Sequence, residues 1–441
     1  MDTITQKELD FNSYLKVNFE GGNLTSDAGM LLYKEFDEKI GFGKTIKNNL
    51  NIEDDINHKQ HENEDVILQR IYQNAAGYHA DLCANELRED PVFLDILQKE
   101  TLASQPTISR VNTKANLDNM KQLQQANFIL QDKIYDYQTP EDKIIFDLDS
   151  TSCETYGQQQ GSAYNHHYGN DGYHPQVLFD GNTGDLLKAE LRSGNVYTSR
   201  QTKRFVGPVF KHYNKKFKSV PLYFRADSGF AKPGLYRLAE EHNVSYTIRL
   251  KANAKLYKKA KAIETKLLDR CGDNLYDKKE IFARFTYQAQ SWAKSRQVIV
   301  KAKKPEEQMT VQFSFIVTNI AAWDPKKIFE FYCQRSTMEN FIKEAKHGFA
   351  LGKMSSTQYW ANASKLQQMV LAYNLNNWLR RICFPESHQS DRIFTIRTKI
   401  VKIAARIVKT GRYLYYQLAS SCPHKKLFMN ILHNIQKLEF A

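Results

Sequence analysis

The sequence predicts an α/β protein in which an α-helical segment precedes a mixed β-sheet. Two observations support this class. Apolar residues recur at helical spacing through residues 1–135, and from residue 136 they gather into short runs of strand length. The runs over residues 136–250 follow the order β-β-β-α-β-α-β. Three antiparallel strands that lead into parallel crossovers give such an order.

The first region, residues 1–135, is predicted to be entirely α-helical. Thr25 or Ser26 can cap a first helix, and Gly41 stands where a C-terminal glycine belongs. Residues 104–110 can begin a DNA recognition helix or equally form a surface turn. Further amphipathic stretches cover residues 65–78, 91–99 and 117–132.

The second region contains the predicted sheet and has the element order of an RNase H-like fold. A strong hairpin turn, Asp180-Gly-Asn-Thr-Gly, joins the second and third strands. The helices are expected at residues 199–217 and 233–242. The strands are expected at residues 143–149, 173–179, 186–191, 220–227 and 244–250.

A β-rich insertion is predicted to interrupt this α/β domain. It holds a lysine-rich stretch and then β-type runs, and a helix returns over residues 325–347. The whole chain is therefore predicted to have five segments. They are an N-terminal helical domain (1–135), a first part of the core (136–250), the insertion (251–323), a second part of the core (324–384) and a basic C-terminal helical region (385–441).

Charge is distributed unevenly along the chain. The net charge is +13, yet residues 1–100 hold 10 basic and 20 acidic side chains. Residues 392–441 hold ten Lys or Arg and one Glu. A basic protein suits a polyanionic partner, usually nucleic acid, so we expect a DNA surface in the later parts of the chain. A basic tail that only maintains solubility is the alternative.

Several features point to a cytoplasmic protein. A hydrophobic content of 41% is typical of a globular chain. No run of 18 apolar residues would form a membrane helix, and the polar start does not resemble a signal peptide. No two of the six cysteines lie within four residues of each other in the sequence. They are therefore interpreted as reduced thiols rather than as a zinc or redox site.

Carboxylates end two of the predicted strands. Asp147 and Asp149 point to one face at the end of the first strand, and Asp227 ends the fourth. These strands are neighbours in the predicted order, so two ionised carboxylates would meet and repel. A divalent ion with oxygen ligands, Mg²⁺ or Mn²⁺, resolves that conflict. The alternatives are that each aspartate only caps a turn, and that Asp147 replaces Asp149 as the ligand.

The helix near residue 339 offers a third carboxylate. At 100° per residue, Glu339 shares a narrow stripe with Tyr332, Arg335, Lys343 and Lys346. An apolar stripe lies beside it, and the neighbouring glutamates point elsewhere. A surface pattern of i,i+4 ion pairs would produce a similar stripe.

These residues resemble a known family. Tyr332, Arg335, Glu339 and Lys346 have the spacing Y-x2-R-x3-E-x6-K, which looks like the signature of one branch of bacterial insertion-sequence transposases of the DDE class. Asp149-Ser-Thr-Ser and Asp227-Ser-Gly-Phe look like the first two motifs of that class. Three N-terminal segments, which begin at Leu24, Glu86 and Leu102, extend the resemblance over about residues 20–380.

The resemblance implies a mechanism. Asp149, Asp227 and Glu339 would bind two Mg²⁺ or Mn²⁺ ions, one activating water or a DNA 3′-hydroxyl and the other stabilising the leaving oxygen. The DNA-binding residues would be Tyr332, Arg335, Lys343 and Lys346. Members of the family act as dimers on double-stranded DNA at paired terminal inverted repeats, and some form hairpins in which a flipped base stacks on an aromatic residue of the insertion. Trp292 and Trp323 lie in or beside that region, although core packing is the commoner role of a tryptophan.

Other classes remain open. A metal-dependent RNase H-like nuclease or resolvase would use the same carboxylates without strand transfer. A non-catalytic DNA-binding protein would not need the three carboxylates Asp149, Asp227 and Glu339, so their presence argues against that class. A tyrosine recombinase would need Arg and His partners for Tyr332. The cluster Asn165-His-His-Tyr with His174 fits no standard transition-metal spacing and is interpreted as loop and strand.

Overall fold

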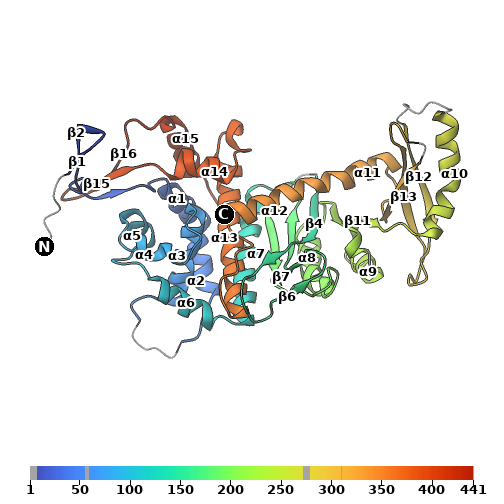
Figure 1. Ribbon diagram of the computed structural model, residues 1–441, viewed down its shortest axis with the longest axis horizontal. Helices are drawn as coiled ribbons and strands as arrows, with labels where there is room; N and C mark the ends of the chain where they lie inside the picture. The colour runs from blue at the N-terminus through green and yellow to red at the C-terminus, as the bar shows by residue number, and fades with distance from the viewer. Residues whose placement is uncertain (1–6, 55–58, 141, 272–278, 309, 441) are drawn as a thin grey trace. The chain divides into compact units, whose positions relative to one another are not determined.

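The computed structural model describes residues 7–54, 59–140, 142–271, 279–308 and 310–440 (Figure 1). The chain divides into two compact units, one formed by residues 1–134 with 371–441 and the other by residues 135–370. Helix α7 spans Leu117–Tyr137 and helix α13 spans Tyr359–Cys383. None of the described helices is long and apolar enough to cross a membrane.

The unit of residues 135–370 is built on an eight-stranded mixed sheet with the order β12-β13-β14-β11-β10-β4-β8-β9. Strands β4, β10 and β11 are parallel neighbours, and the other pairings are antiparallel. Its strands are β4 (Ile144–Ser150), β8 (Gln176–Asp180), β9 (Leu186–Glu190), β10 (Leu222–Ala226), β11 (Val244–Leu250), β12 (Lys279–Tyr287), β13 (Arg296–Lys304) and β14 (Gln312–Thr318).

This order confirms the predicted β-β-β-α-β-α-β succession, with α8 (Thr202–Lys216) and α9 (Pro233–Glu241) as the crossover helices. The predicted hairpin turn joins β8 and β9. Along the chain, residues between β4 and β8 form a small separate sheet. The sequence did not predict this sheet, because its strands are too short to give a periodic signal. Its strands are β5 (Cys153–Glu154), β6 (Ala163–Asn165) and β7 (Asn170–Tyr173).

The lysine-rich part of residues 251–323 forms a helix, α10 (Ala254–Cys271). The three strands that follow extend the large sheet, because β14 pairs with β11. Helix then returns as predicted, although a 3₁₀ turn, η2 (Gln334–Ser336), stands between α11 (Pro325–Cys333) and α12 (Thr337–Gly348).

Helices cover both faces of the large sheet. On one face, Phe210 of α8 packs against Phe146 of β4 and Phe224 of β10. On the other, Tyr223 of β10 packs against Phe331 of α11. Successive strand residues point to opposite faces. The odd-numbered residues of β4 and β10 therefore face α11 and the segment that continues into α12.

The unit of residues 1–134 and 371–441 is mainly helical but not entirely so, and the all-α prediction for residues 1–135 was wrong. Strands β1 (Lys7–Leu9) and β2 (Asn12–Val17) form a hairpin, and β3 (Leu24–Thr25) joins a sheet with β15 (Ala405–Lys409) and β16 (Leu414–Leu418). Strand β3 pairs with a segment near the other end of the chain, so local periodicity gives no sign of it.

The predicted cap of the first helix was also wrong. Thr25 lies in β3, and its hydroxyl donates to the carboxylate of Asp90. The helix begins after Gly29, whereas Gly41 does end it with φ 67° as predicted. The helices of this unit are α1 (Met30–Ile40), α2 (Phe42–Asn49), α3 (Asn63–Ala76), α4 (Cys83–Glu86), α5 (Pro91–Leu97), α6 (Gln105–Lys114), η3 (Glu386–His388), α14 (Ile393–Ile396), η4 (Arg397–Val401) and α15 (Lys425–Gln436).

Candidate active site

Two carboxylates meet at the carboxyl ends of neighbouring parallel strands. In the register of β4 and β10, Leu148 lies beside Ala226, so the next residues, Asp149 and Asp227, occupy adjacent positions at the sheet edge. Burial raises the pKa of Asp149, Arg335 opposes that increase, and the negative charge of Asp227 adds to it. The predicted juxtaposition of these two aspartates is therefore present.

Asp147 has a different environment. Its two carboxylate oxygens accept hydrogen bonds of 2.6 Å from Nε and Nη2 of Arg225. The side chains of Asp147 and Arg225 are 0% and 1% exposed. The hairpin turn closes over this pair, since a Cβ on Gly181 would lie 2.5 Å from Oδ2 of Asp147. Asp147 is thus part of the interior of the sheet, and Asp149 is the carboxylate that reaches its edge.

Asp149 is compensated by Arg335. Oδ2 of Asp149 lies 2.8 Å from Nη2 of Arg335, and the side chains are 24% and 12% exposed. The same Nη2 donates to the carbonyl of Leu148 at 3.0 Å. Burial works against the charge of Arg335, but the surrounding carboxylates, Asp149 first, hold its pKa above the ordinary value. Arg335 therefore links η2 to the end of β4.

Asp227 follows β10 and begins a short 3₁₀ turn, η1 (Ser228–Phe230). Its Oδ1 accepts a hydrogen bond of 2.9 Å from the backbone N–H of Gly229. Oδ1 of Asp149 likewise accepts from the N–H of Ser150 at 2.9 Å. Asp227 therefore caps a turn, as the simpler interpretation of the sequence proposed, whereas Asp149 lies within β4. Within the described residues, Oδ2 of Asp227 has no hydrogen bond or ion pair, so capping does not use the whole group.

The segment with the Tyr-Arg-Glu-Lys spacing runs from α11 through η2 into α12 and lies over this edge. Burial raises the pKa of Tyr332, and the negative charge of Asp227 contributes to the same direction. Lys346 donates to the hydroxyl of Thr151 at 3.2 Å and to the carbonyl of Ser152 at 2.7 Å, which ties α12 to the segment after β4. The two elements predicted to form one site are thus in direct contact.

Glu339 and Lys343 lie exposed on α12, and the predicted apolar stripe beside them is largely buried, with Met338 and Ala345 1% and 0% exposed. Among the residues described, no three His, Cys, Asp or Glu side chains are close enough to hold a metal ion. The structure thus brings Asp149 and Asp227 together but does not gather Glu339 with them into a ready cluster. In this arrangement, Arg335 is the cation beside Asp149.

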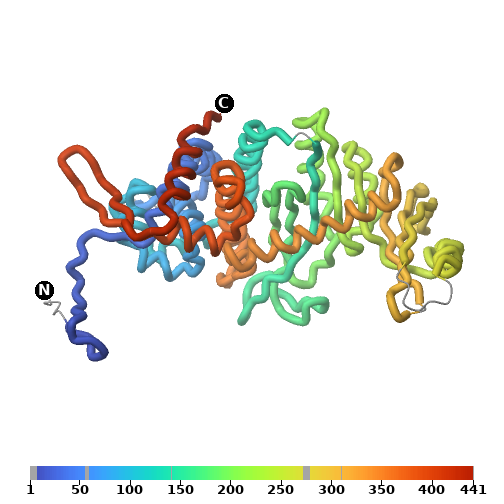
Figure 2. The backbone as a smooth tube through the Cα atoms, turned by 90° about the horizontal axis from the view of Figure 1, so that it is seen from above, coloured from blue at the N-terminus to red at the C-terminus, as the bar shows by residue number. Residues whose placement is uncertain are grey.

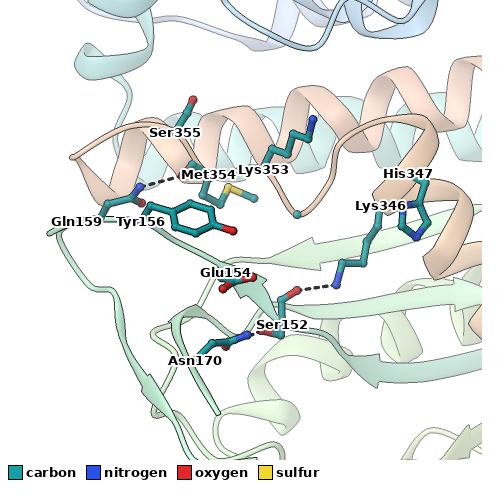
Figure 3. A pocket seen from close by; sticks show the side chains of 11 residues that line it. Ser152, Glu154, Tyr156, Gln159, Asn170, Lys346, His347, Lys353, Met354 and Ser355 are labelled. Atoms are coloured by element: carbon teal, nitrogen blue, oxygen red, sulfur yellow. Dashed lines mark hydrogen bonds between the residues drawn. The ribbon is translucent and has the colours of Figure 1, made fainter. Parts of the chain in front are cut away.

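A cavity of about 690 Å³ opens next to Lys346 (Figure 3). Figure 3 shows Lys346 and Ser152 at one end, where they are hydrogen-bonded, and Gln159 with Tyr156 at the other. Its cations come from α12 and the turn after it, and its acidic side chain from β5. The lining residues are Ser152, Glu154, Tyr156, Gln159, Asn170, Lys346, His347, Gly352, Lys353, Met354 and Ser355.

Tyr168 was singled out from the sequence only as part of a histidine-containing loop. Burial raises the pKa of its hydroxyl, and the negative charges of Asp149 and Asp227 add to the increase. Its ring contacts those of His167 and His174. His174 itself is buried, with Nδ1 3.0 Å from the carbonyl of Val196. The rings of this cluster therefore pack against one another, and one of its histidines is held by a backbone carbonyl.

The two tryptophans near the predicted insertion have packing roles. Trp292 is 6% exposed and contacts Tyr236 and Tyr287 edge to face. Trp323 packs against Tyr223 and Phe331. Neither stands exposed as an aromatic platform for a DNA base.

The fold and this site define a mixed α/β protein with two adjacent carboxylates at one edge of its sheet. The model of the family described as "Transposase DDE domain group 1" matches residues 7–440, and the chain belongs to that family. It is therefore a DDE transposase, an enzyme of DNA transposition, and DDE transposases depend on metal ions.

The chain was also compared with solved structures and with curated proteins. A cryo-EM structure of the piggyBac transposase synaptic complex with hairpin DNA is similar to the chain at 13% sequence identity, with a TM-score of 0.40, and the match covers 85% of this chain and 78% of that one. The search of curated proteins found no match.

Proposed function

We propose that this transposase cleaves DNA at the terminal inverted repeats of a bacterial insertion sequence and joins the freed 3′ ends to target DNA. The observation that supports this most strongly is the pair Asp149 and Asp227 at the ends of adjacent parallel strands, on the face covered by α11, η2 and α12. Such a pair is costly to keep ionised unless a cation compensates it.

The catalytic core is proposed to be RNase H-like. Counted along the core, the strands β4, β8, β9, β10 and β11 stand in the sheet order three, two, one, four, five. Within this framework we propose a mainly helical N-terminal region of residues 1–135 that also contains three short strands, core segments at 136–250 and 324–384, an insertion at 251–323 and a C-terminal region at 385–441.

The residues at the sheet edge fit a divalent ion with oxygen ligands, Mg²⁺ or Mn²⁺. Asp149 and Asp227 supply only oxygen donors, and their mutual repulsion adds to the raised pKa of Asp149. We propose Glu339 as the third ligand, since it lies one helical turn beyond Arg335. Two bound ions would supply an activated nucleophile and stabilise the leaving oxygen.

The cations around the carboxylates are proposed to position DNA. Lys346 is already oriented by Thr151 and Ser152, so less conformational entropy is lost when it meets a phosphate. Lys343 is exposed on α12 and can reach the backbone of DNA directly. Tyr332 and Arg335 lie closer to the aspartates and would contact the phosphate nearest the reaction. The partner is double-stranded DNA, bound by a homodimer that holds two ends, in the bacterial nucleoid.

The test compares two glutamates of the same helical segment. Glu339→Gln removes one proposed ligand while keeping the side chain's size, and we expect Mg²⁺-dependent cleavage of the element's ends to be lost. Glu330→Gln is the matched control, because Glu330 is exposed and only forms a surface pair with Lys326 at 3.8 Å. Full cleavage by Glu339→Gln would sink the proposed site.

A nuclease or resolvase without strand transfer is the alternative that uses the same carboxylates. Pre-cleaved ends with free 3′-hydroxyls distinguish the two, because a transposase joins them to a target plasmid and a nuclease does not. Joined products that require both Mg²⁺ and Glu339 are the expected result.

A further inference from the structure

Hairpin β15–β16 has one covered face and one open face. Its register pairs Ile407 with Tyr416 and Val408 with Tyr415. Ile407 is 8% exposed, and the hydroxyl of Tyr416 donates to the carbonyl of Pro91 and to Asp95 of α5. The alternate residues point the other way. Figure 2 shows the orange-red hairpin as a loop that extends from the rest of the trace.

The open face and the tip combine cations with aromatic rings. Arg406, Lys409 and Arg412 are exposed, and in the described part of the chain none of them is paired with a carboxylate. Tyr413 and Tyr415 are 64% and 48% exposed and contact each other with ring centroids 6.0 Å apart. No acidic residue occurs between residues 392 and 438. This surface therefore presents only positive charge to a partner.

Protection of an exposed sheet edge is the simpler explanation for charges on a hairpin. The edge strand here is β16, since the sheet order is β16-β15-β3. Its sequence, Leu-Tyr-Tyr-Gln-Leu, carries no charge, and the three cations lie on the central strand β15 and in the turn. Arg406 and Arg412 are therefore in the wrong place to protect this edge, and only Lys409 lies where β15 itself extends beyond its pairing with β3.

The second exposed hairpin of the same unit provides a contrast. Hairpin β1–β2 also exposes aromatic rings, with Tyr14 94% exposed. Its charges are mixed, however, and Lys16 pairs with Glu8 at 3.5 Å. Exposure alone does not distinguish the two hairpins, whereas the unpaired positive charge of β15–β16 does.

We propose that hairpin β15–β16 is a DNA-binding arm that lies along duplex DNA. Five residue pairs at about 3.4 Å each give a ribbon roughly 17 Å long, and a major groove about 12 Å wide admits a two-stranded β-ribbon. Arg406, Lys409 and Arg412 contact phosphates, and the hydroxyls of Tyr413 and Tyr415 add hydrogen bonds to the backbone. The inference rests on the assignment of the chain as a DNA transposase, but it concerns a surface remote in sequence from the carboxylates.

The experiment measures the salt dependence of binding by the full-length protein to a blunt duplex of roughly 30 base pairs, about three helical turns. It is done in EDTA, so that no cleavage occurs. The triple variant Arg406→Gln, Lys409→Gln, Arg412→Gln is compared with the wild type. We expect the slope of log K against log salt to fall in magnitude by about 2.7, since each phosphate contact contributes roughly 0.9.

The control removes the same number of charges from the neighbouring helix. Lys425, Lys426 and Lys437 are exposed on or beside α15, and their triple Gln variant should leave the slope near the wild-type value. An unchanged slope in the hairpin variant, or an equal fall in both variants, overturns the proposal. The proposal is also overturned if the hairpin variant changes only the self-association of the protein, as measured by sedimentation. That result would assign the hairpin to contact with a second copy of the chain. Because EDTA removes catalysis, none of these outcomes depends on the proposed metal ligands.

Discussion

The interior and the carboxyl end of the β4–β10 strand pair use the same kinds of side chain for different purposes. In the interior, Asp147 accepts two hydrogen bonds from Arg225, and both side chains are shielded from water. Two residues further along, Asp149 meets Arg335 at 2.8 Å with a quarter of its side chain exposed, and Asp227 lies beside it. One aspartate is closed to other partners, whereas the other can exchange them.

This difference assigns separate roles to neighbouring residues of one strand. A buried ion pair contributes little net stability because desolvation offsets its attraction, but losing one partner is costly. A partly exposed carboxylate next to a second carboxylate is instead poised for a cation. Asp147 is therefore expected to determine stability, and Asp149 and Asp227 to determine activity.

The largest expected effect concerns activity. Asp227→Asn should lower the rate of end cleavage by about a thousandfold or more, because a metal ligand contributes several kcal/mol to the transition state. The fold should be unaffected, since the amide oxygen can still accept from Gly229. Single-turnover cleavage in Mg²⁺, together with circular dichroism, makes the measurement. Activity within tenfold of the wild type would contradict the comparison.

The next effect concerns stability. Arg225→Met leaves the Asp147 carboxylate buried without its partner, and we expect a loss of about 3–5 kcal/mol in the free energy of unfolding. Arg225 also donates to the carbonyl of Phe331 at 2.7 Å, so the variant loses that bond as well. Urea unfolding followed by tryptophan fluorescence reports the change.

The double variant Asp147→Leu, Arg225→Met is the control for this prediction. It removes both charges together, so it should recover most of the stability lost in the single variant. Equal stability losses in the single and double variants would show that packing, and not the uncompensated charge, determines the cost.

A third effect concerns the metal directly. Binding of Mg²⁺ to the folded site should stabilise the protein by about 2.7 kcal/mol at a hundred times the dissociation constant, or roughly 5–10 °C for a unit of this size. The increase should disappear in Asp149→Asn and persist in Glu330→Gln, as measured by thermal unfolding with and without EDTA. A shift of equal size in Asp149→Asn would place the ion elsewhere.

Local sequence signals predicted the part of this site that depends on strands and their ends. Strand β11 was predicted at its observed bounds, Val244–Leu250, where apolar and polar residues alternate with the period of a strand. The sheet-edge positions of Asp149 and Asp227 followed from the order of strands. The choice between Asp147 and Asp149 could not be made in this way, because the partner that buries Asp147 comes from another strand.

The features that the sequence did not predict depend on pairings between residues far apart in the chain. Arg225 was not recognised as a partner of Asp147, since nothing local marks an arginine in a buried strand as paired. The hairpin β15–β16 was not predicted either, because its short strands lie among helices and β15 pairs with β3 near the start of the chain. Both depend on tertiary contacts that sequence periodicity does not report.

The smallest effect extends the comparison to an aspartate between lysines in the other unit. Asp65 lies 2.5 Å from both Lys47 and Lys99, with its side chain 14% exposed. Burial works to raise its pKa, but the hydrogen bonds and charges of the two lysines outweigh it and hold the pKa below the ordinary value. A lowered pKa stabilises the folded state at pH values above the pKa of the unfolded chain, and this contribution is lost as the pH falls through the pKa of the folded state.

Asp65→Asn should therefore cost at most about 1 kcal/mol at neutral pH, much less than Arg225→Met, because its lysine partners remain hydrated. Urea unfolding at neutral and acidic pH checks this, and a cost that persisted undiminished in acid would mean that the carboxylate's shape, and not its charge, stabilises this site.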